Sequence, residues 1–116
     1  MPQPACGRIV LAEVADPQGK NPKVRPLVIL TADADIQQGT PVVAAAISTS
    51  FDQLDPAVYV ALPWHPGGLS RTKLTAPCVA VCNWLVEISP DSIVRYGGWV
   101  PSVLMRELVD KIALLP

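Results

Sequence analysis

The sequence predicts a mainly β fold with one short helix and an amphipathic helix at the C-terminus. Short runs of β-branched and other apolar residues recur between segments rich in proline, glycine, asparagine and aspartate, which is typical of strands joined by turns. After residue 101 the pattern changes to helical spacing with charged residues on the other face, as shown by Leu104, Leu108, Ile112 and Leu115.

Length and composition indicate one folded domain that spans residues 1–116. A chain of 116 residues can bury one core, and a composition of 50% hydrophobic and 16% charged residues excludes a disordered segment. The sequence contains neither a run of about 20 lipid-compatible residues nor a recognisable secretory signal at its start. We therefore expect a cytoplasmic protein that has no membrane-spanning segment.

The first two strands are predicted on either side of a long loop. An apolar run at 8–14 gives the first strand. The second strand is expected at 26–31, with Pro26 at its start, where a missing amide donor costs least. Between them, residues 15–24 are rich in proline, glycine and asparagine, so this segment favours turns over continued strand pairing.

Three further strands are expected in the middle of the chain. Residues 32–40 mix short acids, glutamines and a glycine, which indicates a turn or a single helical turn. The apolar run at 41–48 predicts a buried central strand, and the alternation at 58–62 predicts a half-buried one. The longest strand is expected at 76–88, with a kink or bulge midway.

Helix signals appear near the end of the chain. Ser89 is suited to the N-cap, Pro90 to the first helical position and Asp91 to the first turn, which together predict a short helix or turn. The Tyr-Gly-Gly-Trp segment at 96–99 is expected to be a breaker with aromatic flanks. The amphipathic helix is predicted to follow from Pro101.

The cysteines do not indicate a disulfide framework or a metal site. Cys6, Cys78 and Cys82 are an odd number in a chain without an export signal, so we expect reduced thiols. Cys78 and Cys82 have no companion pair, and His65 is the only histidine, so the ligand set of a structural zinc site is missing. We expect buried apolar packing for the cysteines, and neither a metal nor a cofactor.

The charge distribution leaves two alternatives open. A net charge of −1 gives no global attraction to nucleic acid. Basic residues outnumber acids in 1–25, whereas 32–56 contains acids and no base. This asymmetry indicates either a local basic patch that holds a few phosphates or an ordinary distribution of solvated charges.

The order of the segments resembles the MazF/PemK family of toxin endoribonucleases. The stretch from Gly7 to Thr31 contains a strand, a proline- and glycine-containing loop, and an Arg-Pro pair that leads into a buried strand. VVAAAISTS at 42–50 is similar to the family's apolar third strand, and PGGLSRTKLTAP at 66–77 to the segment before the long strand. A glycine-rich turn precedes the last helix, so the resemblance covers roughly the whole chain.

This resemblance implies a small SH3-like barrel that forms a homodimer, with an RNA groove across the dimer. It also implies metal-independent cleavage of single-stranded RNA, in which a ribose 2′-hydroxyl attacks the adjacent phosphate. The partner that the resemblance implies, besides RNA, is a cognate antitoxin protein.

The resemblance assigns catalytic roles to Arg25 and Ser48. Arg25 matches the family's Arg-Pro pair, and its planar cation can hold a phosphate and offset the charge of the transition state. Ser48 matches a hydroxyl position that is usually threonine in the family, and it can donate a hydrogen bond to a phosphate oxygen. From the residues alone, an ordinary surface arginine and a strand-to-loop turn are the alternatives.

Substrate contacts are expected from five further residues. Lys20 and Lys23 lie in the loop that leads to the arginine and are candidate phosphate contacts, and Thr49 adds a second hydroxyl. His65 follows Trp64, and this pair suggests either a proton shuttle beside a base-stacking ring or a solvated loop. The fifth residue is Asn83, on the longest strand.

Three positions on the longest strand depart from the family pattern. Asn83 stands where family members often have an acid, and Val81 and Val86 stand where they often have arginines. Asparagine retains hydrogen bonding without charge, and the valines contribute only packing. The alternative function is therefore a barrel that has lost catalysis and binds nucleic acid or protein as a regulatory module.

Overall fold

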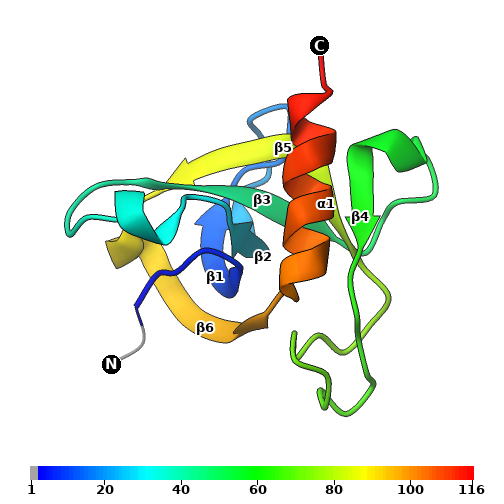
Figure 1. Cartoon of the computed structure of the whole chain (residues 1–116), viewed down its shortest axis with the longest axis horizontal. Coiled ribbons are helices and arrows are strands. Elements are labelled where there is room, and N and C mark those ends of the chain that lie inside the picture. The colour runs from blue at the N-terminus through cyan, green and yellow to red at the C-terminus, as the bar shows by residue number, and fades with distance from the viewer. Residues whose placement is uncertain (1–2) are drawn as a thin grey trace.

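The computed structural model describes residues 3–116, which form one antiparallel sheet with a helix across it (Figure 1). The six strands follow the order β4-β5-β3-β2-β1-β6 in the sheet. In chain order the elements are β1 (Arg8–Val14), β2 (Lys23–Ile29), η1 (Asp33–Asp35), β3 (Val42–Ser48), η2 (Pro56–Val58), β4 (Tyr59–Ala61), β5 (Val79–Ile88), η3 (Pro90–Ser92), β6 (Ile93–Trp99) and α1 (Ser102–Ala113), where η denotes a 3-10 helix.

The curled sheet buries apolar side chains on both of its faces. The helix side holds the first core, in which Met105 and Leu108 of α1 pack against Ile9, Val28 and Ile47. The opposite face holds a second core, which includes the alternate strand residues Val10, Leu27, Ile29, Ala44 and Ala46. Burial on both faces explains why the central strands are continuously apolar.

The predicted fold class is confirmed, with one difference in how the sheet ends. Within residues 3–116 the edge strands β4 and β6 do not pair with each other, so the sheet is curled but open. The loop between β4 and β5 bridges the gap instead. Its Arg71 and Thr72 carbonyls accept hydrogen bonds from the Trp99 and Gly98 amides of β6, at 2.9 and 3.2 Å.

Thr72 anchors this bridging loop. It is a buried polar residue, 1% exposed, and its hydroxyl donates to the Pro63 carbonyl at 2.6 Å. The same oxygen accepts from the Leu74 amide at 3.2 Å. These bonds fix the loop in place across the open side of the sheet.

Strand β6 corrects the expectation that residues 96–99 form a breaker. The glycines lie inside the strand, where the pairing of β6 with β1 shifts register between Arg8 and Val10. A bulge of this kind places an extra residue on one strand. At Gly98 a Cβ atom would collide with the backbone of the bridging loop, so the glycine permits close approach rather than ending the strand.

Strand β2 begins and ends earlier than predicted. It spans Lys23–Ile29 rather than 26–31, because the β1–β2 hairpin continues until Val14 faces Lys23. Pro26 is therefore inside the strand and not at its start. Strand β4 is also shorter than the predicted 58–62, since the 3-10 helix η2 occupies its first residue.

Other predicted elements are confirmed. Strand β5 is the longest at 10 residues, and its pairing with β3 changes register midway. The 3-10 helix η1 lies within the turn expected at 32–40, and the Ser89 hydroxyl accepts from the Asp91 amide at the start of η3. Cys78 and Cys82 are buried as expected, whereas Cys6 is only half-buried. Over residues 3–116, no helix has the length and apolar character needed to cross a membrane.

Replacement of Gly98 by alanine is expected to lower the free energy of unfolding by about 2–3 kcal/mol, the cost of forcing atoms into a packed site. The added methyl group would clash with the carbonyl of Arg71 and separate the bridging loop from β6. Chemical denaturation measures this change.

The matched control is Gly97→Ala, because a Cβ atom there would meet Ile9 at 3.4 Å, close to an ordinary contact. We expect a loss under about 1 kcal/mol for this control. Equal stability of the two variants would contradict the bridging role of the loop.

Candidate functional site

The register of the sheet places Arg25 of β2 across from Ser48 of β3. The β2–β3 ladder pairs Leu27 with Ala46. The same register, carried two residues further, brings Arg25 opposite Ser48. Because side chains alternate along a strand, both lie on the face of the second core, at the place where its apolar packing ends.

Pro26 explains why the two strands separate at this point. Leu30, four residues later and hence on the same edge of β2, donates its amide to Val43 of β3 at 2.8 Å. The nitrogen of Pro26 faces the same way but has no hydrogen to donate. The β2–β3 pairing therefore stops at Leu27, and β2 continues to Lys23 paired with β1 alone.

A cleft with two lobes opens beside this separation. Both lobes are lined by Arg25, Ser48, Ser50 and Trp84. The lysine lobe, about 370 Å³, adds Lys23, Val24, Pro26, Ile47, Thr49, Leu74, Thr75, Ala76 and Cys78. The asparagine lobe, about 450 Å³, adds Pro17, Leu54, Val81 and Asn83.

Three contacts hold the guanidinium of Arg25. Its Nε donates to the Val14 carbonyl at 3.2 Å, and Nη2 donates to the Asn21 carbonyl at 3.1 Å. Its Cζ lies 5.1 Å from the ring centre of Trp84, a cation–π distance. An arginine has five N–H donors, so these two bonds leave three for a ligand.

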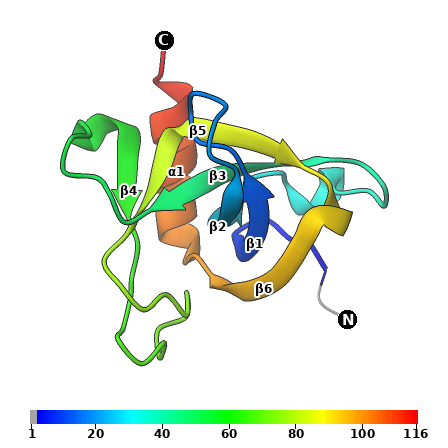
Figure 2. The same ribbon diagram turned by 180° about the vertical axis from the view of Figure 1, so that it is seen from behind.

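Asp16 organises the β1–β2 loop that supplies the Asn21 carbonyl. Its carboxylate accepts from the Lys20 amide at 2.8 Å, the Gln18 amide at 3.0 Å and the Asn21 side chain at 2.9 Å. Asn21 itself has a left-handed backbone, with φ of 55°. Figure 2 shows this loop beside β5, the strand that carries Trp84.

These hydrogen bonds also set the protonation of Asp16. The bond from the Lys20 amide, followed by the bond from Asn21, holds the pKa of the Asp16 carboxyl below its usual value. The carboxylate form is thus favoured by the folded loop. Its contribution is present above the ordinary carboxyl pKa and is lost as the pH falls through the lowered one.

The hydroxyl of Ser48 takes part in a local turn. Its Oγ accepts from the Ser50 amide at 3.0 Å and lies 3.1 Å from the Ser50 carbonyl, to which it donates. The turn chemistry that the sequence suggested is therefore present. It also fixes the oxygen at the cleft; to donate to a ligand, the hydroxyl would have to turn its one hydrogen away from the Ser50 carbonyl.

The cleft is cationic although the chain is slightly acidic. Among the described residues that line it, Lys23 and Arg25 carry positive charge and none carries a carboxylate. Ser48, Thr49 and Thr75 contribute hydroxyls. Such a lining favours an anionic ligand.

The cleft also contains a thiol. Cys78 is 5% exposed, and burial raises the pKa of its thiol, so that it stays protonated at neutral pH. A protonated thiol is a weak nucleophile. Cys78 therefore contributes packing rather than reactivity.

Five of the seven predicted site residues line this cleft, and two do not. Those in the cleft are Arg25, Ser48, Lys23, Thr49 and Asn83. Lys20 lies in the β1–β2 loop, and only its backbone groups contact Asp16. His65 lies in the β4–β5 loop, where its Nδ1 accepts from the Gly67 amide at 2.9 Å.

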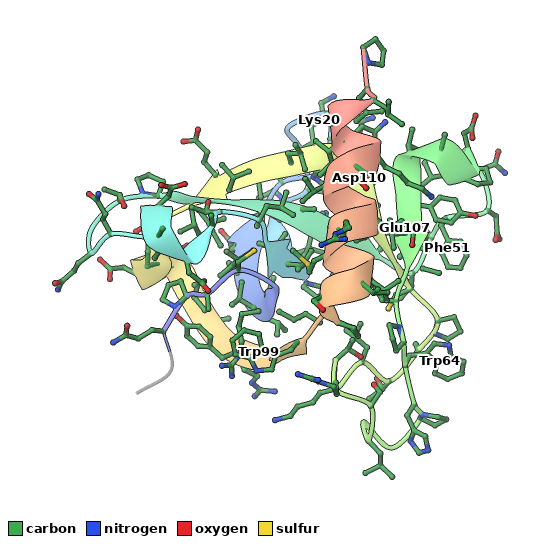
Figure 3. All side chains as sticks on the ribbon, in the orientation of Figure 1. Lys20, Phe51, Trp64, Trp99, Glu107 and Asp110 are labelled. Atoms are coloured by element: carbon green, nitrogen blue, oxygen red, sulfur yellow. The ribbon has the colours of Figure 1, made fainter. Side chains whose placement is uncertain are left out.

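Figure 3 shows Lys20 and Trp64, the residue before His65, at well separated places on the molecule. Neither Lys20 nor His65 is among the residues that line the two lobes.

Sequence reasoning missed Trp84, Ser50, Thr75 and Asp16. In the sequence, Trp84 is one residue of the apolar run at 76–88, and it lies over Arg25 close to the register change between β3 and β5. Asp16 carried a usable signal, because an aspartate before Pro-X-Gly is a frequent turn former. Thr75 had none, since its place depends on the path of the bridging loop.

The three β5 residues that differ from the family pattern, Val81, Asn83 and Val86, add no charge to the cleft. Val81 is 4% exposed and forms an apolar part of the asparagine lobe, while Asn83 is exposed there. Val86 packs against the second core. Over residues 3–116, His, Cys, Asp and Glu side chains form no group of three or more that is arranged to hold a metal ion.

The fold and the cleft together define a small β-sheet domain with a cationic cleft at the point where β2 and β3 separate. The sequence model of the PemK-like, MazF-like toxins of type II toxin–antitoxin systems matches residues 5–115. The chain therefore belongs to this family, and the resemblance found in its sequence is confirmed. Comparison with curated protein sequences gave no match.

Solved structures with the same fold include three mycobacterial proteins. An endoribonuclease from a mycobacterial species has a TM-score of 0.71 at 17% identity, covering 97% of this chain and 90% of the other. An endoribonuclease in complex with its cognate antitoxin, also mycobacterial, has a TM-score of 0.68 at 18% identity, covering 95% and 91%. The Mycobacterium tuberculosis toxin MazF-mt6 has a TM-score of 0.65 at 22% identity, covering 90% and 92%.

Replacement of Asp16 by alanine is expected to loosen the β1–β2 loop and release Arg25 from the Asn21 carbonyl. The Lys20 amide should exchange its hydrogen faster, and the Arg25 side-chain N–H signals should broaden or shift. The pH step that accompanies Asp16 protonation in the unaltered chain should disappear. Amide exchange and NMR titration measure these effects.

The control variant is Asn21→Gly, which keeps the backbone carbonyl and tolerates the left-handed backbone. It should disturb Arg25 less than Asp16→Ala does. If the Arg25 signals were the same in all three proteins, Asp16 would have no part in holding the guanidinium.

Proposed function

We propose that this chain is a toxin endoribonuclease that cleaves single-stranded RNA at the Arg25–Ser48 cleft. The observation that carries the proposal is the guanidinium of Arg25, which lies across from a hydroxyl and has three N–H donors left for a phosphate, in a cleft whose lining within residues 3–116 carries no carboxylate. Family membership and the endoribonuclease names of two structural neighbours support it.

The proposed reaction is an internal transfer at phosphorus that needs no metal ion. The ribose 2′-oxygen forms a bond to the adjacent phosphorus, and the bond from phosphorus to the 5′-oxygen breaks. The products are a 2′,3′-cyclic phosphate and a 5′-hydroxyl. Arg25 offsets the negative charge that grows on the phosphoryl oxygens, and Ser48 donates a hydrogen bond to one of them.

Proton transfer in this scheme involves solvent. Neither a carboxylate nor an imidazole is among the described residues that line the cleft. A guanidinium with a pKa above about 12 is a poor proton acceptor or donor near neutrality. We therefore assign Arg25 to charge stabilisation, while the 2′-hydroxyl loses its proton to water or hydroxide, and the leaving 5′-oxygen gains one from water.

The proposal includes partners. We propose that the chain acts as a cytoplasmic homodimer and is inhibited by a cognate antitoxin. The structural neighbour solved with its cognate antitoxin supports the second point. An extended acidic or apolar antitoxin segment would fit a cleft lined by Lys23, Arg25 and Trp84.

One alternative function has a specific observation in its favour. Val81 and Asn83 leave the β5 side of the cleft without charge. This supports a regulatory module that binds nucleic acid or protein and does not cleave RNA. Growth arrest upon expression separates the two, because a module without catalysis should be harmless.

The test of catalysis is incubation of the purified protein with single-stranded RNA in EDTA. We expect fragments that end in a cyclic phosphate, and a rate at least about 100-fold lower for Arg25→Ala, the usual cost of removing one transition-state donor. Arg25→Lys should be intermediate, because it keeps the charge and loses the planar fork.

Equal cleavage by Arg25→Ala and the unaltered chain would indicate a contaminating nuclease. A folded protein that cleaves no RNA would support the binding module.

The pH profile tests proton transfer to solvent. If hydroxide removes the 2′-hydroxyl proton, the logarithm of the single-turnover rate should rise steadily between about pH 6 and 9. A bell-shaped profile with a maximum in this range would contradict the scheme, because it would require a protein acid and base.

A further inference from the structure

The two lobes of the cleft differ in chemistry. Besides the four shared residues, the asparagine lobe is walled by the apolar side chains of Pro17, Leu54 and Val81, and its other polar group is the carboxamide of Asn83. The lysine lobe instead offers the ammonium of Lys23 together with threonine hydroxyls. One lobe is therefore suited to a flat apolar group with a polar edge, and the other to a charged backbone.

The carboxamide of Asn83 is available to a ligand. Asn83 is exposed, and it lines the asparagine lobe. It lies one residue before Trp84, whose ring contributes to the wall of the same lobe. A carboxamide donates and accepts at once, which complements a nucleobase edge that presents an acceptor beside a donor.

We propose that the asparagine lobe is a nucleobase pocket, in which Asn83 selects the base next to the phosphate bound by Arg25 and the lysine lobe holds the adjoining RNA backbone. Arg25 and Ser48 line both lobes, so a phosphate bound there lies between the base and the backbone. Apolar walls with an aromatic ring and one edge-reading side chain are the usual means of recognising an unpaired base.

This inference rests on the proposed RNA-binding function. It adds that one lobe binds the RNA backbone and the other recognises a base. A phosphate contact such as Lys23 acts on every sequence alike. A contact to a base edge acts at one nucleotide only. The Asn83 position, where charge is absent, would thus determine which RNA is bound rather than how strongly RNA is attracted.

The test is equilibrium selection from a randomised single-stranded RNA pool that carries 2′-fluoro groups and hence lacks the attacking hydroxyl. The unaltered chain should enrich one base at one position. Asn83→Ala should reduce that enrichment about ten-fold and leave other positions unchanged. Asn83→Asp should shift the preference toward cytosine, because a carboxylate only accepts hydrogen bonds.

Lys23→Ala is the matched comparison. It should weaken binding of all sequences alike and reduce the slope of log affinity against log salt concentration by about 1. A base preference that is unchanged in Asn83→Ala, or a uniform loss of affinity in that variant, would overturn the proposal. Absence of any base preference in the unaltered chain would overturn it as well.

Cleavage of unmodified RNA separates this proposal from the proposed function. Cleavage whose sequence preference does not depend on Asn83 would refute the base pocket and keep the nuclease. A protein that does not cleave, but binds with a preference that Asn83→Ala abolishes, would refute the nuclease and keep the pocket.

Discussion

The constraint on which the site depends is the end of the β2–β3 ladder at Pro26. A proline in an inner strand removes one amide donor, and here that donor would have pointed at β3. The strands separate at this residue, and the register that pairs Leu27 with Ala46 leaves Arg25 and Ser48 facing each other across the opening. The two residues of the Arg-Pro pair thus have linked effects. Pro26 ends the β2–β3 pairing and so opens the cleft, and Arg25 places a positive charge in it.

The surrounding elements hold the Arg25 guanidinium in place and leave three of its five N–H donors for a ligand. The β1–β2 hairpin supplies the Val14 and Asn21 carbonyls, and the register change in β5 brings Trp84 under the guanidinium. Each contact is local to a different element, so the position of the guanidinium depends on the assembled sheet. A group ordered in advance loses less conformational freedom when a ligand binds.

Much of the fold could be predicted from the sequence, because apolar runs and turn residues are local signals. Strand β6 could not, since Gly97 and Gly98 together resemble a breaker, and only the close approach of the Arg71 backbone shows why Gly98 lies inside a strand. For the site, Arg25 and Ser48 were identified through the family resemblance, and their residue types alone left surface and turn alternatives open. Trp84 was missed because its role follows from a register change, which is a property of two strands together.

The charge of the cleft limits how it can bind RNA. Lys23 and Arg25 are the cations among its described lining residues, and the chain as a whole carries a charge of −1. Two phosphate contacts give weak, salt-sensitive attraction, far below that of strongly basic nucleic-acid binders. Useful affinity must then come from stacking and hydrogen bonds to bases, or from a second copy of the cleft that engages the same strand. If the proposed function holds, selectivity for RNA sequence and dependence on a dimer would each compensate for the same lack of charge.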